Sequence, residues 1–97
     1  MDFYIIINYI LYSHSMSFKS LKKAIKYRVS YSGTKETDIL YKKYFIDDFY
    51  KFNENDLIDI QKLFNNYSDN EMYDFLTKKR NIPYQYDNIF KKILNEN

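Results

Sequence analysis

The sequence predicts an all-α fold, a compact bundle of five short helices, within a single domain of 97 residues. Three observations support this prediction. From Ser17 onward, apolar residues recur every three or four positions, which is the period of an amphipathic helix. Residues that commonly cap helix N-termini precede several of these periodic segments. The connections between the segments are about 2–6 residues long, which is typical of neighbouring helices in a bundle.

Ser17 is the expected N-cap of the first helix, in which lysines separate the apolar positions. This helix is expected to end near Arg28, because the segment 29–33 combines weak helix formers with the only glycine of the chain. We therefore expect Gly33 at a position that needs a positive φ or the close approach of another backbone. The apolar positions of the helix are Phe18, Leu21, Ile25 and Val29.

A second helix is expected to begin near Thr34. Glu36 and Asp38 would lie in its first turn, where carboxylates interact favourably with the helix dipole. The predicted apolar stripe of this helix comprises Ile39, Leu40, Tyr44, Phe45 and Phe49.

Three further helices complete the predicted bundle. Asn53 is the expected cap of the third, and Ser68 with Glu71 forms a capping box that opens the fourth. The fourth is expected to hold three cations in its last turn, Lys78, Lys79 and Arg80, before the segment 81–83 ends it at a proline. The fifth spans roughly residues 86–95. The expected core residues of the three helices are Leu57, Ile60, Leu63, Phe64, Met72, Phe75, Leu76, Ile89, Phe90, Ile93 and Leu94.

Residues 1–16 differ from the rest and are set apart as an N-terminal extension. The apolar run from Phe3 to Tyr12 is shorter than the roughly 20 residues that a membrane-spanning helix needs. No secretory signal is evident, because a positive n-region and a small-residue cleavage site are missing. Three interpretations stay open: a short strand or unpacked tail, an upstream translation artefact that precedes a true start at Met16, or part of an organellar presequence. The last rests on the absence of acidic residues from segment 3–35.

The composition excludes several kinds of chemistry. The chain has no cysteine, which excludes disulfides, thiolate metal sites and thiol catalysis. A single histidine, His14, does not make a zinc site without a cluster of carboxylates, and nothing around it resembles a hydrolase triad. We therefore expect no catalytic residue and no metal site.

Charge is unevenly distributed along the chain. Residues 1–35 hold six basic side chains against one acid, a net +5, whereas residues 36–97 hold nine against twelve, a net −3. A basic first third suits nucleic acid, anionic lipid or an acidic protein surface, and it equally suits a solvated helix face. A small nucleic-acid-binding helical protein is thus the main alternative function, although no aromatic stacking platform is evident beside the lysines of the first helix.

One local group of residues goes beyond packing. Tyr27 and Arg28 precede a glycine turn, and Glu36 follows Gly33 in the first turn of the second helix. Such a turn makes an exposed corner, whose free N–H groups at the helix start can bind an acceptor. From these residues alone, an ordinary helix–helix turn and a binding corner both remain open. A phosphate-binding loop is excluded because that motif needs several glycines.

The order of these residues resembles the SdhE family of FAD assembly factors, known in eukaryotes as the succinate dehydrogenase assembly factor 2 family. Its hallmark is Arg-Gly-x-x-Glu between the first two helices, usually followed by an Asp two residues after the Glu; Gly33, Glu36 and Asp38 match it. The segment 69–76 is similar to the family's second block, an acidic residue followed by Leu-Tyr-x-Trp-Leu. Pro83 and the closing helix match its ending, so the resemblance covers about residues 18–95.

Two positions depart from the family pattern. Ser32 stands where the family has an arginine, which removes a charged, multidentate donor from the corner. Phe75 stands where the family has a tryptophan, and this change keeps an aromatic side chain for the core.

The resemblance implies a chaperone-like assembly factor rather than an enzyme. Its partner would be the flavoprotein subunit of succinate dehydrogenase, and in some bacteria that of fumarate reductase. It would promote covalent attachment of FAD to the partner while holding no cofactor stably itself. Residues 17–97 would form the SdhE-like domain, a monomer that binds neither nucleic acid nor membrane, in the bacterial cytoplasm or alternatively the mitochondrial matrix. The expected partner-binding residues are Tyr27, Arg28, Ser32, Gly33, Lys35, Glu36 and Asp38.

Overall fold

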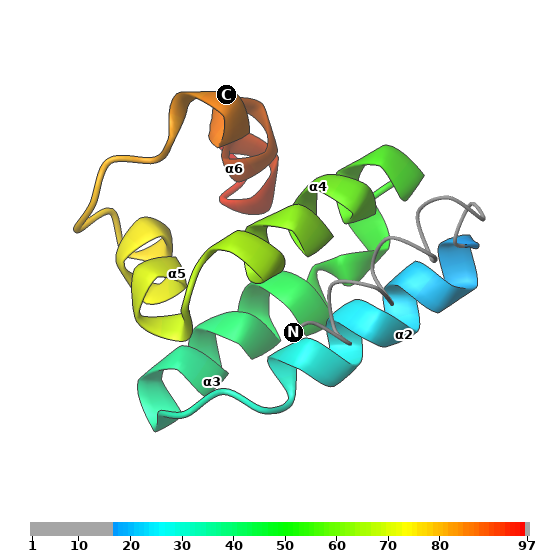
Figure 1. Ribbon diagram of the computed structural model, residues 1–97, viewed down its shortest axis with the longest axis horizontal. Helices are drawn as coiled ribbons and strands as arrows, with labels where there is room; N and C mark the ends of the chain where they lie inside the picture. Colours follow the sequence, from blue (N-terminus) through cyan, green and yellow to red (C-terminus); the bar gives the residue numbers. More distant parts are fainter. Residues whose placement is uncertain (1–16, 97) are drawn as a thin grey trace.

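Five α-helices follow one another in the computed structural model, which describes residues 17–96 (Figure 1). The predicted all-α class is confirmed, and the described residues contain no strand. The N-terminal extension 1–16 and the prediction for His14 lie outside the described residues. The helices are α2 (Phe18–Val29), α3 (Lys35–Lys42), α4 (Glu54–Asn66), α5 (Asp69–Leu76) and α6 (Asp87–Ile93).

Side-chain caps fix the starts of four of these helices. The side chains of Ser17, Thr34, Asn53 and Ser68 each accept a hydrogen bond from the backbone N–H three residues later. The backbone N–H of Asn53 and that of Ser68 in turn donate to the acidic side chain three residues later, which completes a capping box at each. Each cap stabilises its helix by about 0.5–2 kcal/mol. The predicted starts of these four helices are therefore confirmed.

The segment after α3 continues as a π-helix, Lys43–Asp47, and then a 3₁₀ turn, Phe49–Lys51. Its buried residues fall at every fourth position: Thr37, Tyr41, Phe45 and Phe49. In a straight α-helix a four-residue repeat drifts around the axis by about 40° per step. The wider π turn offsets this drift, so that one stripe keeps facing the core.

The predicted stripe of α3 is wrong at one position. Ile39 is 60% exposed, whereas Tyr41 is buried and occupies the core position. Leu40 and Tyr44 are partly buried against the core, and Phe45 and Phe49 are buried as predicted.

The end of α5 also differs from the prediction, because Lys78, Lys79 and Arg80 lie beyond the helix. Lys78 adopts a left-handed conformation with φ of 62°, and its N–H donates to the carbonyl of Phe75. The N–H of Lys79 donates to the carbonyl of Asp74, at 2.8 Å. This pair of hydrogen bonds is a Schellman motif, which ends the helix one turn earlier than expected.

The last helix is shorter than the predicted span 86–95. A 3₁₀ turn, Tyr84–Tyr86, precedes α6, and a second Schellman motif follows it. In that motif Asn95 has φ of 58°, and Asn is a residue that tolerates this conformation.

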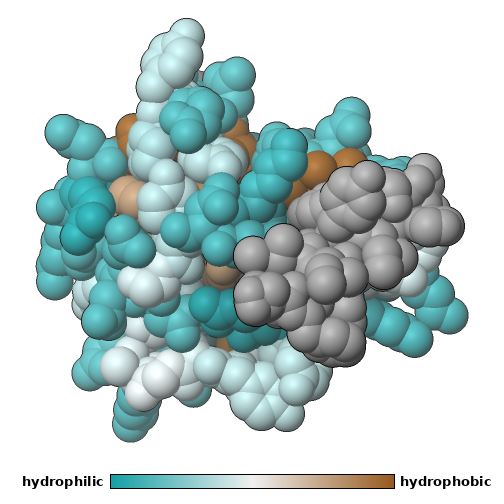
Figure 2. All heavy atoms as spheres, viewed as in Figure 1, coloured by the Kyte–Doolittle hydropathy of each residue, from teal (hydrophilic) through white to brown (hydrophobic). Residues whose placement is uncertain are grey.

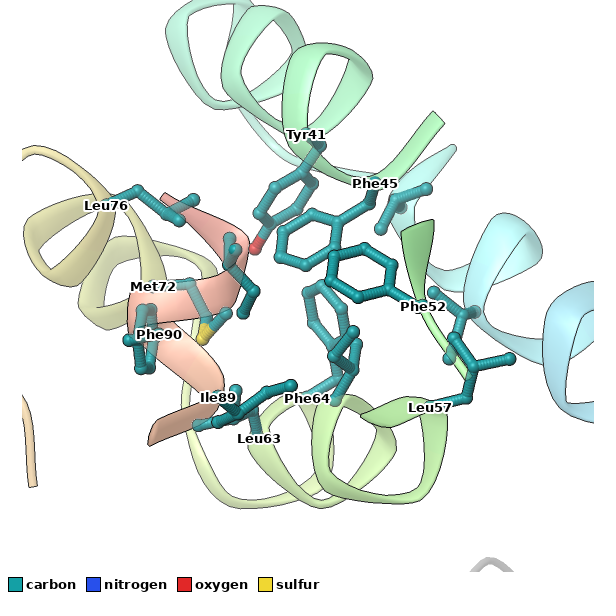
Figure 3. Close-up of a cluster of buried hydrophobic side chains, with 14 of the residues drawn as sticks. Tyr41, Phe45, Phe52, Leu57, Leu63, Phe64, Met72, Leu76, Ile89 and Phe90 are labelled. Atoms are coloured by element: carbon teal, nitrogen blue, oxygen red, sulfur yellow. The ribbon is translucent and has the colours of Figure 1, made fainter. Parts of the chain in front are cut away.

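Aromatic rings fill the centre of the bundle (Figure 3). Tyr41, Phe45 and Phe64 meet edge to face, with ring centroids 5.2–5.8 Å apart. Phe75, in the position of the family's tryptophan, is 1% exposed and lies edge to face with Phe90. Edge-to-face pairs add about 0.5–1.5 kcal/mol beyond the burial of their area. Eighteen apolar residues form this core, from all five helices and from the segments that join α3 to α4 and α5 to α6.

The packing brings the start of α3 beside α5. Helix α2 contacts α4, α3 contacts α5, and α4 contacts α6. In Figure 1 the turn between α2 and α3 therefore lies on the same side of the bundle as α5. Two segments about 35 residues apart in sequence, the glycine turn and the first turn of α5, share one surface.

Candidate partner-binding site

The turn that joins α2 to α3, together with the first residues of α3, forms a corner at the surface; we call residues 30–36 the Gly33 corner. Gly33 does not have a positive φ. A Cβ added to it would meet no atom within 4 Å, so no other backbone of the described chain approaches it. A positive φ is therefore not the reason for a glycine here, and within residues 17–96 no close backbone is the reason either. The space in front of Gly33 is open to another molecule.

Hydrogen bonds brace the Gly33 corner from within. The hydroxyl of Ser32 donates to the carboxylate of Asp38 and lies 3.3 Å from the carbonyl oxygen of Thr34. Thr34 accepts from the N–H of Thr37 at 3.2 Å, and its hydroxyl donates to that of Thr37 at 2.8 Å. Ser32 and Asp38 thus hold the turn against the first turn of α3.

Arg28 lies half-buried against the bundle. Its guanidinium donates to the carboxylate of Asp69 at 2.7 Å and lies 5.2 Å from the ring centroid of Phe64. The same carboxylate oxygen accepts from the hydroxyl of Tyr41, also at 2.7 Å. We call Arg28, Tyr41 and Asp69 the Asp69 clamp, because they join α2, α3 and α5.

Burial raises the pKa of the Tyr41 phenol, and the hydrogen bond to Asp69 and its negative charge raise that pKa further. The opposing charge of Arg28 lowers it by less. The phenol therefore stays neutral and remains a donor at any physiological pH. In α5, the pKa of Glu71 is lowered because its carboxylate accepts from the backbone N–H of Ser68, which stabilises the charged form.

Five of the seven predicted binding residues are exposed; Arg28 and Ser32 are half-buried. Gly33, Lys35 and Glu36 belong to the Gly33 corner, Asp38 follows it in α3, and Tyr27 precedes it on α2. Tyr27 is 69% exposed, and its ring lies 4.8 Å from that of Tyr31, which is equally exposed. This pair supplies the aromatic surface that the sequence did not reveal. Lys35 and Glu36 have no ion pair or hydrogen bond to a side chain within residues 17–96.

Two surface hollows flank the start of α3. One has a volume of about 330 Å³ and is lined by Thr34, Glu36, Thr37, Asn70 and Tyr73; we call it the Glu36 hollow. The other, of about 470 Å³, is lined by Val29, Ser30, Asp38, Lys42 and Ile46. Glu36 and Asp38 face different hollows because two residues turn an α-helix by about 200°.

Neither a metal centre nor a membrane span is present in the part of the chain that the structure describes. Within residues 17–96, no three His, Cys, Asp or Glu side chains are grouped so as to hold a metal ion. In the same part of the chain, every helix is too short or too polar to cross a bilayer.

A sequence model described as the flavinator of succinate dehydrogenase matches residues 23–97. The chain belongs to this family, Sdh5. The match runs from the middle of α2 past the end of α6, so it includes the Gly33 corner, the Asp69 clamp and the Glu36 hollow. It confirms the resemblance seen in the sequence. No curated protein and no solved structure matches the chain.

Ser32 is the position at which this chain departs from the motif of its family. It stands where the SdhE-type motif has an arginine, and its hydroxyl is used within the turn. Two cations lie close to it in sequence, Arg28 and Lys35, and Arg28 is held by Asp69. Lys35 is therefore the cation of this motif that remains free of ion pairs within residues 17–96.

Five residues at or beside the site were not predicted as site residues from the sequence: Tyr31, Tyr41, Asp69, Asn70 and Tyr73. The last three lie in the segment 69–76, which resembles the family's second block. Asp69 and Tyr41 are 28 residues apart, and only the packing of α3 on α5 brings them together. Tyr31 had a local signal, because it follows Tyr27 by four residues, the spacing that aligns side chains along one face of a helix.

Proposed function

We propose that this protein binds the flavoprotein subunit of succinate dehydrogenase and promotes the covalent attachment of FAD to it. The observation that carries the proposal is the family match over residues 23–97, which spans nearly the whole helical bundle. The Gly33 corner supports it, because this corner leaves polar and aromatic groups exposed around a backbone that a partner can approach.

The proposed role needs no catalytic side chain in this protein. A binding protein accelerates a reaction of its partner when it binds best to the conformer in which the reacting groups are well placed. Raising such a conformer from about 1% to about half of the population takes a preference of roughly 100-fold. A small, well-packed bundle suits this task, since its surface does not have to be ordered on binding.

Within this proposal, the predicted site residues divide into two groups. Gly33, Glu36, Lys35 and Tyr27 face outward and would contact the partner. Arg28, Ser32 and Asp38 make hydrogen bonds within the fold, and their role would be to hold the first group in place. The protein would act as a monomer that keeps no FAD of its own. It would work where the flavoprotein subunit folds, in the bacterial cytoplasm or alternatively in the mitochondrial matrix.

Flavinylation can be followed directly. The apo-flavoprotein subunit is incubated with FAD and a dicarboxylate, with and without this protein, and covalent flavin is detected by in-gel fluorescence. The proposal expects a clear gain of fluorescence with the protein present. No gain, together with salt-sensitive binding to duplex DNA, would refute the proposal and favour the alternative function.

One observation speaks for that alternative, a small nucleic-acid-binding protein. Lys19, Lys23 and Tyr27 recur at four-residue spacing on α2, and Tyr27 and Tyr31 form an exposed aromatic pair at its end. Aromatic side chains beside cations are typical of single-stranded nucleic acid sites. A single-stranded oligonucleotide is therefore included beside the duplex in the binding measurement.

A further inference from the structure

The Glu36 hollow is a polar hollow between two helices that the proposed function does not by itself explain. Its walls come from the start of α3, with Thr34, Glu36 and Thr37, and from the first two turns of α5, with Asn70 and Tyr73. We propose that the Glu36 hollow is the receptor for one arginine side chain of the flavoprotein subunit. This inference rests on the proposed function and adds the chemistry by which the partner is recognised.

Some polar side chains of the hollow are hydrogen-bonded within the fold and others are not. The hydroxyls of Thr34 and Thr37 are hydrogen-bonded to each other. In contrast, the side chains of Glu36, Asn70 and Tyr73 have no hydrogen bond to another residue within the described part of the chain. A carboxylate, an amide and a phenol are thus left to bind a ligand.

The surroundings of Glu36 differ from those of most other acids. Nine of the twelve acidic side chains in residues 17–96 are engaged by a cation or a hydroxyl; the other three are Glu36, Glu54 and Asp59. Glu54 and Asp59 lie on α4 and line neither of the two hollows beside the start of α3. Glu36 combines a free carboxylate, a hollow and a place beside the open glycine.

The size of the hollow limits what it can hold. At about 330 Å³ it lies at the low end of the roughly 300–1,000 Å³ found for small-molecule sites, and it is open to solvent. Such a volume suits a single inserted side chain rather than a dinucleotide. The lining is polar, with a carboxylate, an amide and three hydroxyls, which favours a polar or charged ligand over an apolar one. The face of the bundle seen in Figure 2 is likewise mostly hydrophilic where it is not grey.

Arginine matches the lining groups best. Its planar guanidinium can donate two parallel hydrogen bonds to the Glu36 carboxylate and further bonds to the Asn70 amide oxygen. The ring of Tyr73 offers a face to a cation, and it already has the Lys79 ammonium 5.1 Å from its centroid. The Asp69 clamp fixes the distance between the walls, because Asp69 directly precedes Asn70 and is bound to α2 and α3.

The test compares two matched variants of the full chain, Glu36→Gln and Glu54→Gln, in binding to the apo-flavoprotein subunit. Both remove one negative charge from the first turn of a helix, and neither residue is ion-paired within residues 17–96. Glu36→Gln is expected to weaken binding about 10- to 100-fold, the usual loss for a hydrogen-bonded charge. Tyr73→Leu is expected to weaken it about 3- to 10-fold. Glu54→Gln is expected to bind within about twofold of the wild type.

Chemical footprinting identifies the ligand. The flavoprotein is treated with the arginine-selective reagent phenylglyoxal, alone and in complex, and modified peptides are found by mass spectrometry. We expect one flavoprotein arginine to be protected by the wild type and by Glu54→Gln but not by Glu36→Gln. Protection of a lysine instead, shown with a lysine-selective reagent, would overturn the assignment of arginine.

Failure of the inference is distinguishable from failure of the proposed function. If the wild-type chain neither binds the flavoprotein nor raises its covalent flavin, the proposed function is wrong and the inference with it. If the wild type does both and Glu36→Gln binds as tightly as Glu54→Gln, only the inference is wrong. Far-UV circular dichroism and thermal unfolding of each variant exclude loss of folding as the cause of weaker binding.

Discussion

Replacing Asp69 by Ala should lower the free energy of unfolding by about 2–4 kcal/mol. Two hydrogen bonds of 2.7 Å are lost, one from the Arg28 guanidinium and one from the hydroxyl of Tyr41. Hydrogen bonds to a charged group contribute about 1.5–3 kcal/mol each. Arg28 and Asp69 keep 32% and 25% of their side chains exposed, so water replaces part of what is lost on that side. Tyr41 is 1% exposed, so its hydroxyl is left without a partner.

The assay is urea unfolding followed by far-UV circular dichroism, with Asp87→Ala as the matched control. Asp87 is also the first residue of its helix and also forms an ion pair, with Lys91, but both side chains are about half exposed. Its loss removes a similar dipole interaction and a surface ion pair, together about 1 kcal/mol or less. Equal losses for Asp69→Ala and Asp87→Ala would refute the view that the Asp69 clamp stabilises the bundle.

Four further substitutions test other parts of the structure. Gly33→Arg should abolish binding to the flavoprotein and leave the circular dichroism spectrum unchanged, because a Cβ at Gly33 meets nothing within 4 Å; a loss of helicity would show that the glycine is structural. Ser32→Arg should tighten the complex by restoring the family's donor, and a weaker complex would mean that this corner recognises its partner differently. Tyr41→Phe should remove a pH dependence of the free energy of unfolding, because the pKa of Tyr41 is raised in the folded state. The stabilisation is complete below about pH 10, and above it the advantage of the wild type over the variant should fall by about 1.4 kcal/mol per pH unit. A constant difference between the two in urea unfolding would contradict the raised pKa. Lys78→Gly should raise the free energy of unfolding by about 0.5–1 kcal/mol, because Lys78 has φ of 62°, and an unchanged midpoint in urea would argue against strain there.

The local features of the fold could be predicted from the sequence. Ser17, Asn53 and Ser68 cap their helices as expected, because a cap depends only on residues within one turn. The periodic apolar residues of α4 and α5 are all buried for a similar reason. Such features require no knowledge of what lies across the core.

The errors in predicting the helices came from alternatives that the sequence does not resolve. A lysine in the left-handed conformation ends α5, although glycine is the residue that favours this conformation. The only glycine, Gly33, does not adopt it. In α3, Tyr41 rather than Ile39 is buried, because it continues the stripe of Thr37 and Phe45 and its hydroxyl finds a partner in Asp69.

The position of the candidate site was predicted from the sequence, but the Glu36 hollow beside it was not. The Gly33 corner follows from residues adjacent in sequence, and the structure leaves Glu36 exposed in it and Tyr27 exposed on α2 just before it. The second wall of the Glu36 hollow, Asn70 and Tyr73, comes from α5, more than 30 residues away in sequence. Packing of α3 on α5 creates this hollow, and no spacing within the sequence encodes it.

The intact mass of the flavoprotein subunit shows directly whether this chain promotes FAD attachment. The apo-subunit is incubated with FAD and a dicarboxylate, and samples are taken at several times. Each sample is denatured to release unattached flavin, and the intact mass of the subunit is measured by mass spectrometry. We predict that the wild-type chain raises the fraction of subunits carrying the mass of one covalent FAD, and that Gly33→Arg at the same concentration does not. An equal rate of attachment with the wild type, with Gly33→Arg and with no added protein would contradict the account.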